Sequence, residues 1–99
     1  MFQSIEQIKK LNKINDFYWF SPDTMRFFRS IVYPTLYGGR LFVTSEKGPN
    51  EVRSFTVREA DEDGSISSAS EFQQFGSYAE AKSWARMHAI EKGYSLSSH

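Results

Sequence analysis

The chain has 99 residues, of which 12 are Lys or Arg and 12 are Asp or Glu, so its formal net charge is zero. A chain of this length forms one domain with a modest core, and its 16% aromatic content excludes an intrinsically disordered protein. It has no cysteine, which excludes disulfide bonds, thiolate catalysis and cysteine-based zinc sites. Zero net charge argues against a nucleic-acid reader, although it leaves room for a local basic patch.

The N-terminal segment has none of the marks of a secretory leader. Residues 1–15 place isolated apolar side chains between Lys and Gln, without the continuous apolar run of a signal peptide. No apolar run approaches the roughly 20 residues that span a bilayer. We therefore expect a cytoplasmic protein with no membrane partner.

The first predicted element is a helix over residues 4–15. Ser4 is a candidate N-cap, and Gln7 three residues later completes a capping box. Apolar residues recur at three-residue intervals and form a broad, slanted stripe, which consists of Ile5, Ile8, Leu11 and Ile14.

A second, short helix over residues 22–30 is predicted from its start signal. Ser21 can cap the helix, Pro22 suits the first helical position, and Asp23 favours the positive end of the helix dipole. Residues 31–39 contain Pro34 and a Gly pair, and we expect them to be a connector without regular structure.

The clearest predicted feature is a β-hairpin with strands over residues 40–47 and 51–60 and a turn at residues 48–50. Placing Lys47 opposite Glu51 fixes the register of the pair. One face of the hairpin is then apolar and carries the pairs Leu41–Val57 and Val43–Phe55. The other face carries the pairs Phe42–Thr56, Thr44–Ser54 and Arg40–Arg58.

The C-terminal part begins with a turn at residues 61–64 and a weak edge strand over residues 65–70. Phe72 and Phe75 are expected to anchor the next segment to the core. A helix over residues 77–92 has a capping box and a terminal glycine, and residues 94–99 form a polar tail. The expected sheet-facing side of this helix consists of Ala81, Trp84, Ala85 and His88.

Together these elements predict a single α+β domain over residues 1–99. Its expected architecture is a three-stranded antiparallel β-meander, with two N-terminal helices and a C-terminal helix packed on one face of the sheet. The opposite face of the sheet could then remain open to a partner.

No group of residues in the sequence predicts catalysis or metal binding. His88 has no nucleophile motif beside it, so we expect a partly buried, hydrogen-bonded histidine. A calcium loop beginning at Asp61 would need Gly and Glu where the chain has Ile66 and Phe72. We therefore predict no enzyme activity, no cofactor and no metal.

The residues that are not assigned to the predicted core indicate a partner-binding face, which consists of Arg40, Phe42, Thr56, Arg58 and Trp19. Like charges placed directly across two strands are destabilising, so the Arg pair needs an explanation. Either a nearby Glu46, Glu59 or Glu71 neutralises these cations, or they form a contact surface for anions. Trp19 joins the set because the aromatic residues 17–20 cannot all point inward on an extended segment.

The segment Tyr18-Trp19-Phe20-Ser21-Pro22-Asp23-Thr24-Met25-Arg26-Phe27-Phe28 begins a resemblance to a family of small uncharacterised proteins of phages and mobile elements. It continues through residues 37–46, 56–59 and 72–75, and it implies a phage-like origin without a mechanism. Small proteins of such origin are often inhibitors of host systems, including anti-CRISPR proteins.

These observations predict a non-enzymatic binding protein that acts in the cytoplasm of a host cell. It would inhibit a host defence system such as CRISPR-Cas by occluding a host protein or effector complex. The alternative is a small nucleic-acid-binding accessory protein that uses the same arginine and aromatic face, extended by Arg26, Arg29 and Arg53. Zero net charge is also compatible with a homodimer.

Overall fold

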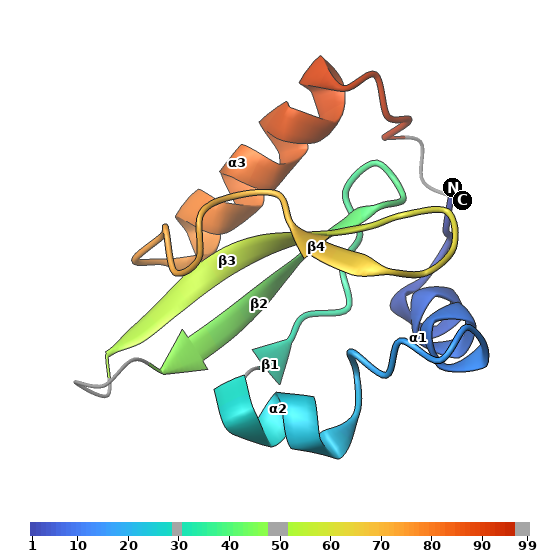
Figure 1. Cartoon of the computed structure of the whole chain (residues 1–99). Helices are drawn as coiled ribbons and strands as arrows, with labels where there is room; N and C mark the ends of the chain where they lie inside the picture. Colours follow the sequence, from blue (N-terminus) through green and yellow to red (C-terminus); the bar gives the residue numbers. More distant parts are fainter. Residues whose placement is uncertain (29–30, 48–51, 97–99) are drawn as a thin grey trace.

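The computed structural model of the chain describes residues 1–28, 31–47 and 52–96. Four strands form one antiparallel sheet in the order β1-β2-β3-β4. The elements in chain order are α1 (Ile5–Ile14), α2 (Pro22–Phe28), β1 (Ile31–Val32), β2 (Leu41–Lys47), β3 (Arg53–Ala60), β4 (Ile66–Ser68) and α3 (Tyr78–Glu91). The predicted α+β class and antiparallel meander are confirmed, and Figure 1 shows α3 and α1 on different sides of the sheet.

Serine side chains cap α1, α2 and α3, as predicted. The Ser4 hydroxyl accepts a hydrogen bond from the Gln7 N–H at 3.3 Å, and the Ser77 hydroxyl accepts one from the Glu80 N–H at 3.2 Å. At α2, the Ser21 hydroxyl accepts from the Thr24 N–H at 3.3 Å. Each cap satisfies a backbone donor that the first helical turn leaves without a partner.

The register of the central hairpin differs from the prediction by two residues. Val43 lies opposite Val57, and Phe42 lies opposite Arg58. A shift of two residues keeps every side chain on its predicted face. The predicted pair of Arg40 with Arg58 is wrong, so no like-charge contact forms between them. The predicted turn at 48–50 and the Lys47–Glu51 pair involve residues outside those described, and Lys47 instead pairs with Arg53.

A short strand occupies part of the predicted connector. β1 pairs with β2, and the Tyr33 N–H donates to the Val43 carbonyl at 3.2 Å. The extended conformation suits the β-branched residues Ile31 and Val32. At the opposite edge, β4 is shorter than predicted because Ser70 leaves the ladder and its hydroxyl accepts from the Val57 N–H. The second predicted helix ends at Phe28, and its last two residues and tail residues 97–99 lie outside the described residues.

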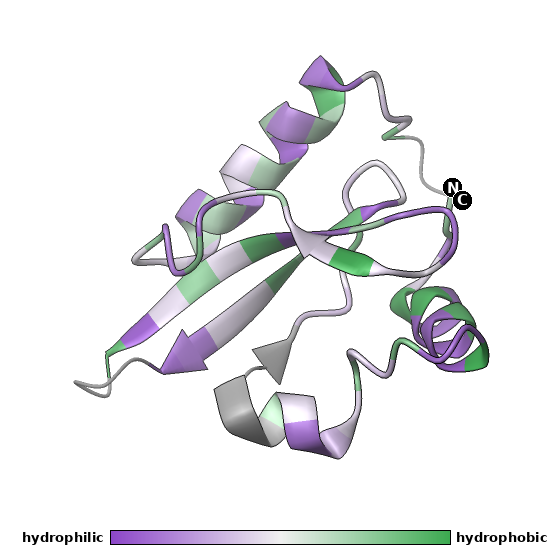
Figure 2. Cartoon of the chain, viewed as in Figure 1, coloured by the Kyte–Doolittle hydropathy of each residue, from purple (hydrophilic) through white to green (hydrophobic). Residues whose placement is uncertain are grey.

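The core lies on both faces of the sheet. On one face, α3 packs small, fully buried alanines against β2 and β3; this cluster includes Ala81, Ala85, Ala89, Leu41, Val43, Phe55 and Val57. On the other face, α1 buries Ile5 and Ile8 against Phe42 and Ala60. The expectation that all helices pack on one face and leave the other open is therefore wrong. Figure 2 shows that both helices carry hydrophobic and strongly hydrophilic residues, as elements with one buried side do.

Two asparagines tie α1 to the turn between β3 and β4. The Asn12 amide donates to the Gly64 carbonyl at 2.7 Å, and the Asn15 amide donates to the Asp63 carbonyl at 2.7 Å. The Asn12 side-chain oxygen also accepts from the Trp19 N–H at 2.8 Å. Asn12 is almost fully buried, so this polar contact fixes α1 at one position on the sheet. No helix of the described part of the chain is long and apolar enough to cross a membrane.

Gly38 provides a test of how α3 and the segment after it pack. Its φ is +62°, and a Cβ at this position would stand 2.4 Å from the Tyr94 Cβ and 3.0 Å from the Ala89 Cβ. We expect Gly38→Ala to lower the free energy of unfolding by about 2 kcal/mol or more, because both the backbone and the contact are unfavourable. Urea denaturation measures the change.

Two other glycines are matched controls for that substitution. Gly93 has φ +77°, but a Cβ added there would meet no atom within 4 Å, so Gly93→Ala should cost about 1 kcal/mol from the backbone alone. Gly76 has neither a positive φ nor a neighbour within 4 Å, and Gly76→Ala should be nearly neutral. Equal losses for Gly38→Ala and Gly93→Ala would contradict the described packing.

Candidate functional site

The structure brings four of the five predicted binding residues together and buries most of them. Phe42 and Thr56 are fully buried, and Arg58 is 7% exposed. The Trp19 ring packs edge-on against Phe42, with ring centroids 6.0 Å apart. Arg40 lies apart from this group. The predicted open arginine and aromatic face is therefore wrong as an open surface, because α1 and the aromatic segment cover it.

A buried ion pair organises this cluster. Arg58 Nη2 donates to Glu46 Oε1 at 2.7 Å, and the Glu46 side chain is 1% exposed. Glu46 also accepts from the hydroxyls of Thr44 at 2.6 Å and Thr56 at 3.1 Å. Arg58 Nε donates to Thr44 Oγ1 at 3.1 Å, and Nη1 donates to Ser68 Oγ at 2.8 Å. Both charges are thus hydrogen-bonded on several sides, as buried charges require.

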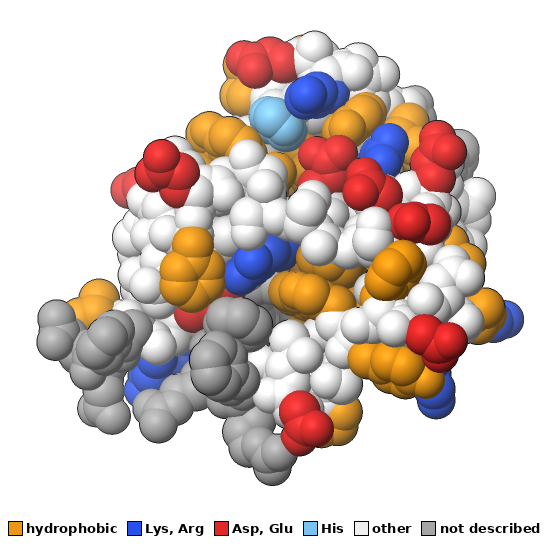
Figure 3. Space-filling model, viewed as in Figure 1, with side chains coloured by type: hydrophobic (Ala, Val, Ile, Leu, Met, Phe, Trp, Pro, Cys, Tyr) orange, Lys and Arg blue, Asp and Glu red, His pale blue; other side chains and the backbone are white. Residues whose placement is uncertain are grey.

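Two aromatic rings lie close to the Arg58 guanidinium. Its Cζ lies 5.5 Å from the centroid of Trp19 and 5.6 Å from that of Phe72. These distances are within the range of cation–π attraction. Phe72 is 51% exposed, so the expectation that it anchors the core is wrong, whereas Phe75 is buried as expected. Figure 3 shows a basic side chain set back in a hollow between hydrophobic side chains on the face that carries β4.

Residues with left-handed backbone conformation occur in both aromatic segments, residues 17–20 and 72–75. Tyr18 has φ +54°, and Gln73, which follows Phe72, has φ +57°. This conformation is unfavourable for bulky residues and is found where surrounding contacts impose it. The Trp19 N–H bond to Asn12 and the Gln73 N–H bond to Thr56 Oγ1, at 2.8 Å, supply such contacts. Strained backbone concentrates at binding sites, which makes this cluster the leading candidate site.

Arg40 is neutralised at another place. Its Nε donates to the Ala60 carbonyl at 3.0 Å, and its Nη2 lies 3.2 Å from Asp61 Oδ1. Its Cζ stands 5.3 Å from the Tyr94 ring centroid, and the Tyr94 hydroxyl donates to Glu59 at 2.8 Å. Burial, followed by this bond to Glu59, raises the pKa of Tyr94. Of the two alternatives, neutralisation by a nearby Glu46, Glu59 or Glu71 applies to Arg58, which pairs with Glu46, whereas Arg40 pairs with Asp61, a residue outside that set.

Five residues around Arg58 were missing from the predicted set, which are Thr44, Glu46, Ser68, Phe72 and Gln73. Glu46 was considered only as a neutralising charge, although strand alternation places it on the same face as Thr44 in either register. Phe72 and Gln73 lie in a loop whose path depends on the bond between Gln73 and Thr56, which no local pattern signals.

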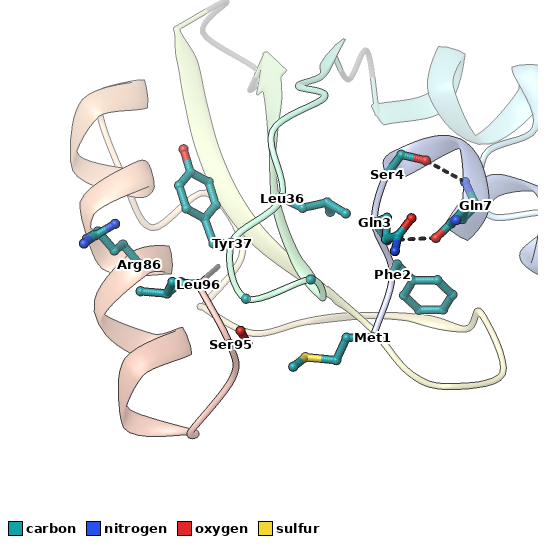
Figure 4. A pocket seen from close by; sticks show the side chains of 12 residues that line it. Met1, Phe2, Gln3, Ser4, Gln7, Leu36, Tyr37, Arg86, Ser95 and Leu96 are labelled. Atoms are coloured by element: carbon teal, nitrogen blue, oxygen red, sulfur yellow. Dashed lines mark hydrogen bonds between the residues drawn. The ribbon is translucent and has the colours of Figure 1, made fainter. Parts of the chain in front are cut away.

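A second hollow, of about 710 Å³, lies where the N-terminal segment meets Gly38, Gly39 and residues 95–96. Figure 4 shows that its polar groups do not converge. Gln7 Oε1 accepts from the Gln3 N–H, and the Gln7 N–H donates to Ser4, so these groups serve the start of α1. Arg86 points away from Met1 and Phe2. A ligand site needs a few polar groups aimed at one point, so this hollow is the weaker candidate.

The acidic turn between β3 and β4 uses its carboxylates internally. Asp63 Oδ1 accepts from the Ser65 hydroxyl at 2.7 Å and from the Ser65 N–H at 3.0 Å. These hydrogen bonds lower the pKa of Asp63 below its ordinary value of 3.8. Within residues 1–28, 31–47 and 52–96, no group of three or more His, Asp or Glu side chains could hold a metal ion.

Comparison with known protein families assigns the chain to one of them. Residues 4–86 match the family described as "Family of unknown function (DUF7447)". The chain belongs to this family. The matched range runs from the cap of α1 into α3 and contains every residue of the Arg58 cluster. This cluster consists of Trp19, Phe42, Thr44, Glu46, Thr56, Arg58, Ser68, Phe72 and Gln73. No curated protein and no solved structure matches the chain.

The ion pair between Arg58 and Glu46 can be tested by a double-mutant cycle. Glu46→Gln leaves a buried cation without its carboxylate, so we expect a loss of roughly 3–5 kcal/mol in the free energy of unfolding. Arg58→Met should be similarly costly, whereas the double variant should cost much less than the sum of the two. Thermal and urea unfolding would measure the cycle.

The exposed pair of Glu6 and Lys9, 3.7 Å apart, provides the control for that cycle. Glu6→Gln should change the free energy of unfolding by less than about 1 kcal/mol, because water screens surface pairs. Additive losses in the Glu46 and Arg58 cycle would contradict a coupled buried pair.

The acidic turn yields a pH-dependent prediction. Ser65→Ala removes the hydroxyl that bonds Asp63 but keeps the backbone N–H, so the pKa of Asp63 should rise towards 3.8. Since the pKa is depressed in the folded state, Asp63 stabilises the fold above pH 3.8 and loses this effect as the pH falls below it. NMR titration of the Asp63 carboxyl measures the shift. Ser67→Ala, a nearby exposed change, should leave this pKa unaltered.

Proposed function

We propose that this protein is a non-enzymatic binding module that occludes a partner protein. The sequence resemblance to small phage proteins makes a host defence complex, such as a CRISPR-Cas effector, the expected class of target. The resemblance supports the target class only by analogy, and the surface chemistry supports the binding role. The proposed setting is the cytoplasm of a host cell.

The observation that carries this proposal is the exposure of two aromatic rings, one on Phe72, which lies within cation–π distance of Arg58, and one on Tyr18, which directly precedes Trp19 in the chain. Tyr18 and Phe72 are each 51% exposed. Tyr18 has a strained backbone itself, and Phe72 directly precedes a residue that does. A rigid aromatic side chain loses little conformational entropy on binding, and aromatic residues are enriched in the parts of interfaces that contribute most to affinity. Fixed, exposed rings are therefore a suitable contact surface for a protein.

The charges favour a protein over a nucleic acid as the partner. Arg58 is paired with Glu46 and Arg40 with Asp61, so neither contributes an unneutralised cation for a phosphate. A phosphate that reached Arg58 would also be repelled by Glu46, whose carboxylate lies 2.7 Å from the same guanidinium. Of the other proposed phosphate contacts, Arg53 donates to Ser45, and Arg29 and the Arg26 side chain lie outside the described part.

An inhibition assay that compares variants of the proposed surface with variants of a control surface tests the proposal. The tagged protein is used to capture partners from a phage-infected host lysate, and a captured effector is then purified and assayed for cleavage of target DNA. We expect the wild-type protein to inhibit cleavage and Tyr18→Ala/Phe72→Ala to weaken binding at least tenfold, because truncating aromatic anchors typically costs more than about 1.4 kcal/mol.

Exposed apolar residues on α3 provide the matched control. Met87→Ala/Ile90→Ala removes two side chains of similar exposure, on a helix that contributes nothing to the Arg58 cluster, and should leave inhibition unchanged. Equal inhibition by the wild type and the Tyr18 and Phe72 variant would overturn the proposed surface. A shift of short DNA or RNA by the protein in low salt would favour the nucleic-acid alternative instead.

A further inference from the structure

Within residues 1–28, 31–47 and 52–96, the hydrogen bonds of Arg58 use only part of its guanidinium. An arginine has five N–H donors in one plane. Three of them donate within the described part of the chain, to Thr44, Ser68 and Glu46. Trp19 and Phe72 lie near the guanidinium, within cation–π distance. Two N–H groups of Arg58 therefore have no acceptor among the described residues, and Ser68, which accepts from Nη1, lies at the exposed surface.

The charge of the site favours a neutral acceptor for these two donors. Glu46 Oε1 accepts from Thr44 and Arg58, and Oε2 accepts from Thr56, so the carboxylate is held beside the guanidinium. The pair has no net charge. An incoming anion would meet Glu46 as well as Arg58, whereas a carbonyl oxygen would meet only a directed donor.

The surroundings of these donors favour an apolar group next to that carbonyl. Phe72 is half exposed, and the partly buried Trp19 stands within cation–π distance of the same guanidinium. Flat rings pack against other rings in offset or edge-on arrangements that add to the effect of burial. A peptide that places a carbonyl and an aromatic side chain close together satisfies both requirements.

We propose that the Arg58 cluster receives an uncharged peptide segment of the partner protein. A carbonyl oxygen of that segment accepts from the unused N–H groups of Arg58, and an adjacent aromatic side chain packs against Phe72 and Trp19. This inference rests on the proposed binding function and specifies the chemistry of the partner. It also assigns Glu46 a positioning role, since its charge cancels that of Arg58 and selects against anions.

Isotope-edited NMR with small probes tests this inference without the partner. The neutral probe is N-acetyl-phenylalaninamide, which has carbonyl groups and one ring, and the anionic probe is inorganic phosphate. We expect the neutral probe, at millimolar concentration, to shift the Arg58 Nε–H and Trp19 indole N–H signals in a saturable way. Phosphate at the same concentration and ionic strength should not shift them. N-acetyl-alaninamide, which lacks the ring, should bind at least fivefold more weakly.

Variants locate the binding site of the probe. Phe72→Ala changes a half-exposed side chain, so the fold should persist while the affinity for the neutral probe falls at least threefold. Met87→Ala on α3 should leave that affinity unchanged. Saturable shifts by phosphate, no shift by the neutral probe, or an unchanged affinity of Phe72→Ala would each overturn the inference.

The outcome for the probe is separable from that for the proposed function. If Tyr18→Ala/Phe72→Ala abolishes inhibition of a captured effector but the neutral probe does not bind, the occlusion function stands and the peptide chemistry is wrong. If the probe binds and that variant inhibits like the wild type, the cluster binds uncharged peptide groups but is not the surface that occludes the effector.

Discussion

The buried pair of Glu46 and Arg58 is the constraint on which the rest of the candidate site depends. Its two charges lie on neighbouring strands, β2 and β3, and each is hydrogen-bonded to threonine or serine hydroxyls of the same sheet face. A buried charge without its partner is costly, so the pair fixes the positions of both side chains. The rings of Trp19 and Phe72 each lie within cation–π distance of this fixed guanidinium.

The sequence predicted local structure well, since the signals for it are local. Helix caps depend on residues three positions apart, and the faces of β2 and β3 depend on alternation, which a two-residue change of register preserves. The register itself was wrong because it depended on a turn pairing at Lys47 that the strands do not make.

The candidate site was harder to predict because it depends on contacts between distant segments. Phe42 and Ala60 lie on the same sheet face as Arg58, and nothing local shows that α1 covers them. The hydrogen bond from Gln73 to Thr56 and that from Trp19 to Asn12 place the two rings. The sequence indicates that Arg58 has an unusual environment, but it predicts an open surface. The structure instead shows a buried ion pair beside two aromatic rings.

The asparagine contacts of α1 have a consequence for the order of folding. Asn12 and Asn15 bond to carbonyls of Gly64 and Asp63, about half the chain away. A short isolated helix is marginally stable in water, so α1 cannot be held in place until the turn between β3 and β4 has formed. During synthesis on the ribosome, α1 therefore emerges before β2, β3 and β4 but docks only after the turn between β3 and β4 has formed, and until then it does not shield Phe42 and Ala60 from solvent or from a chaperone.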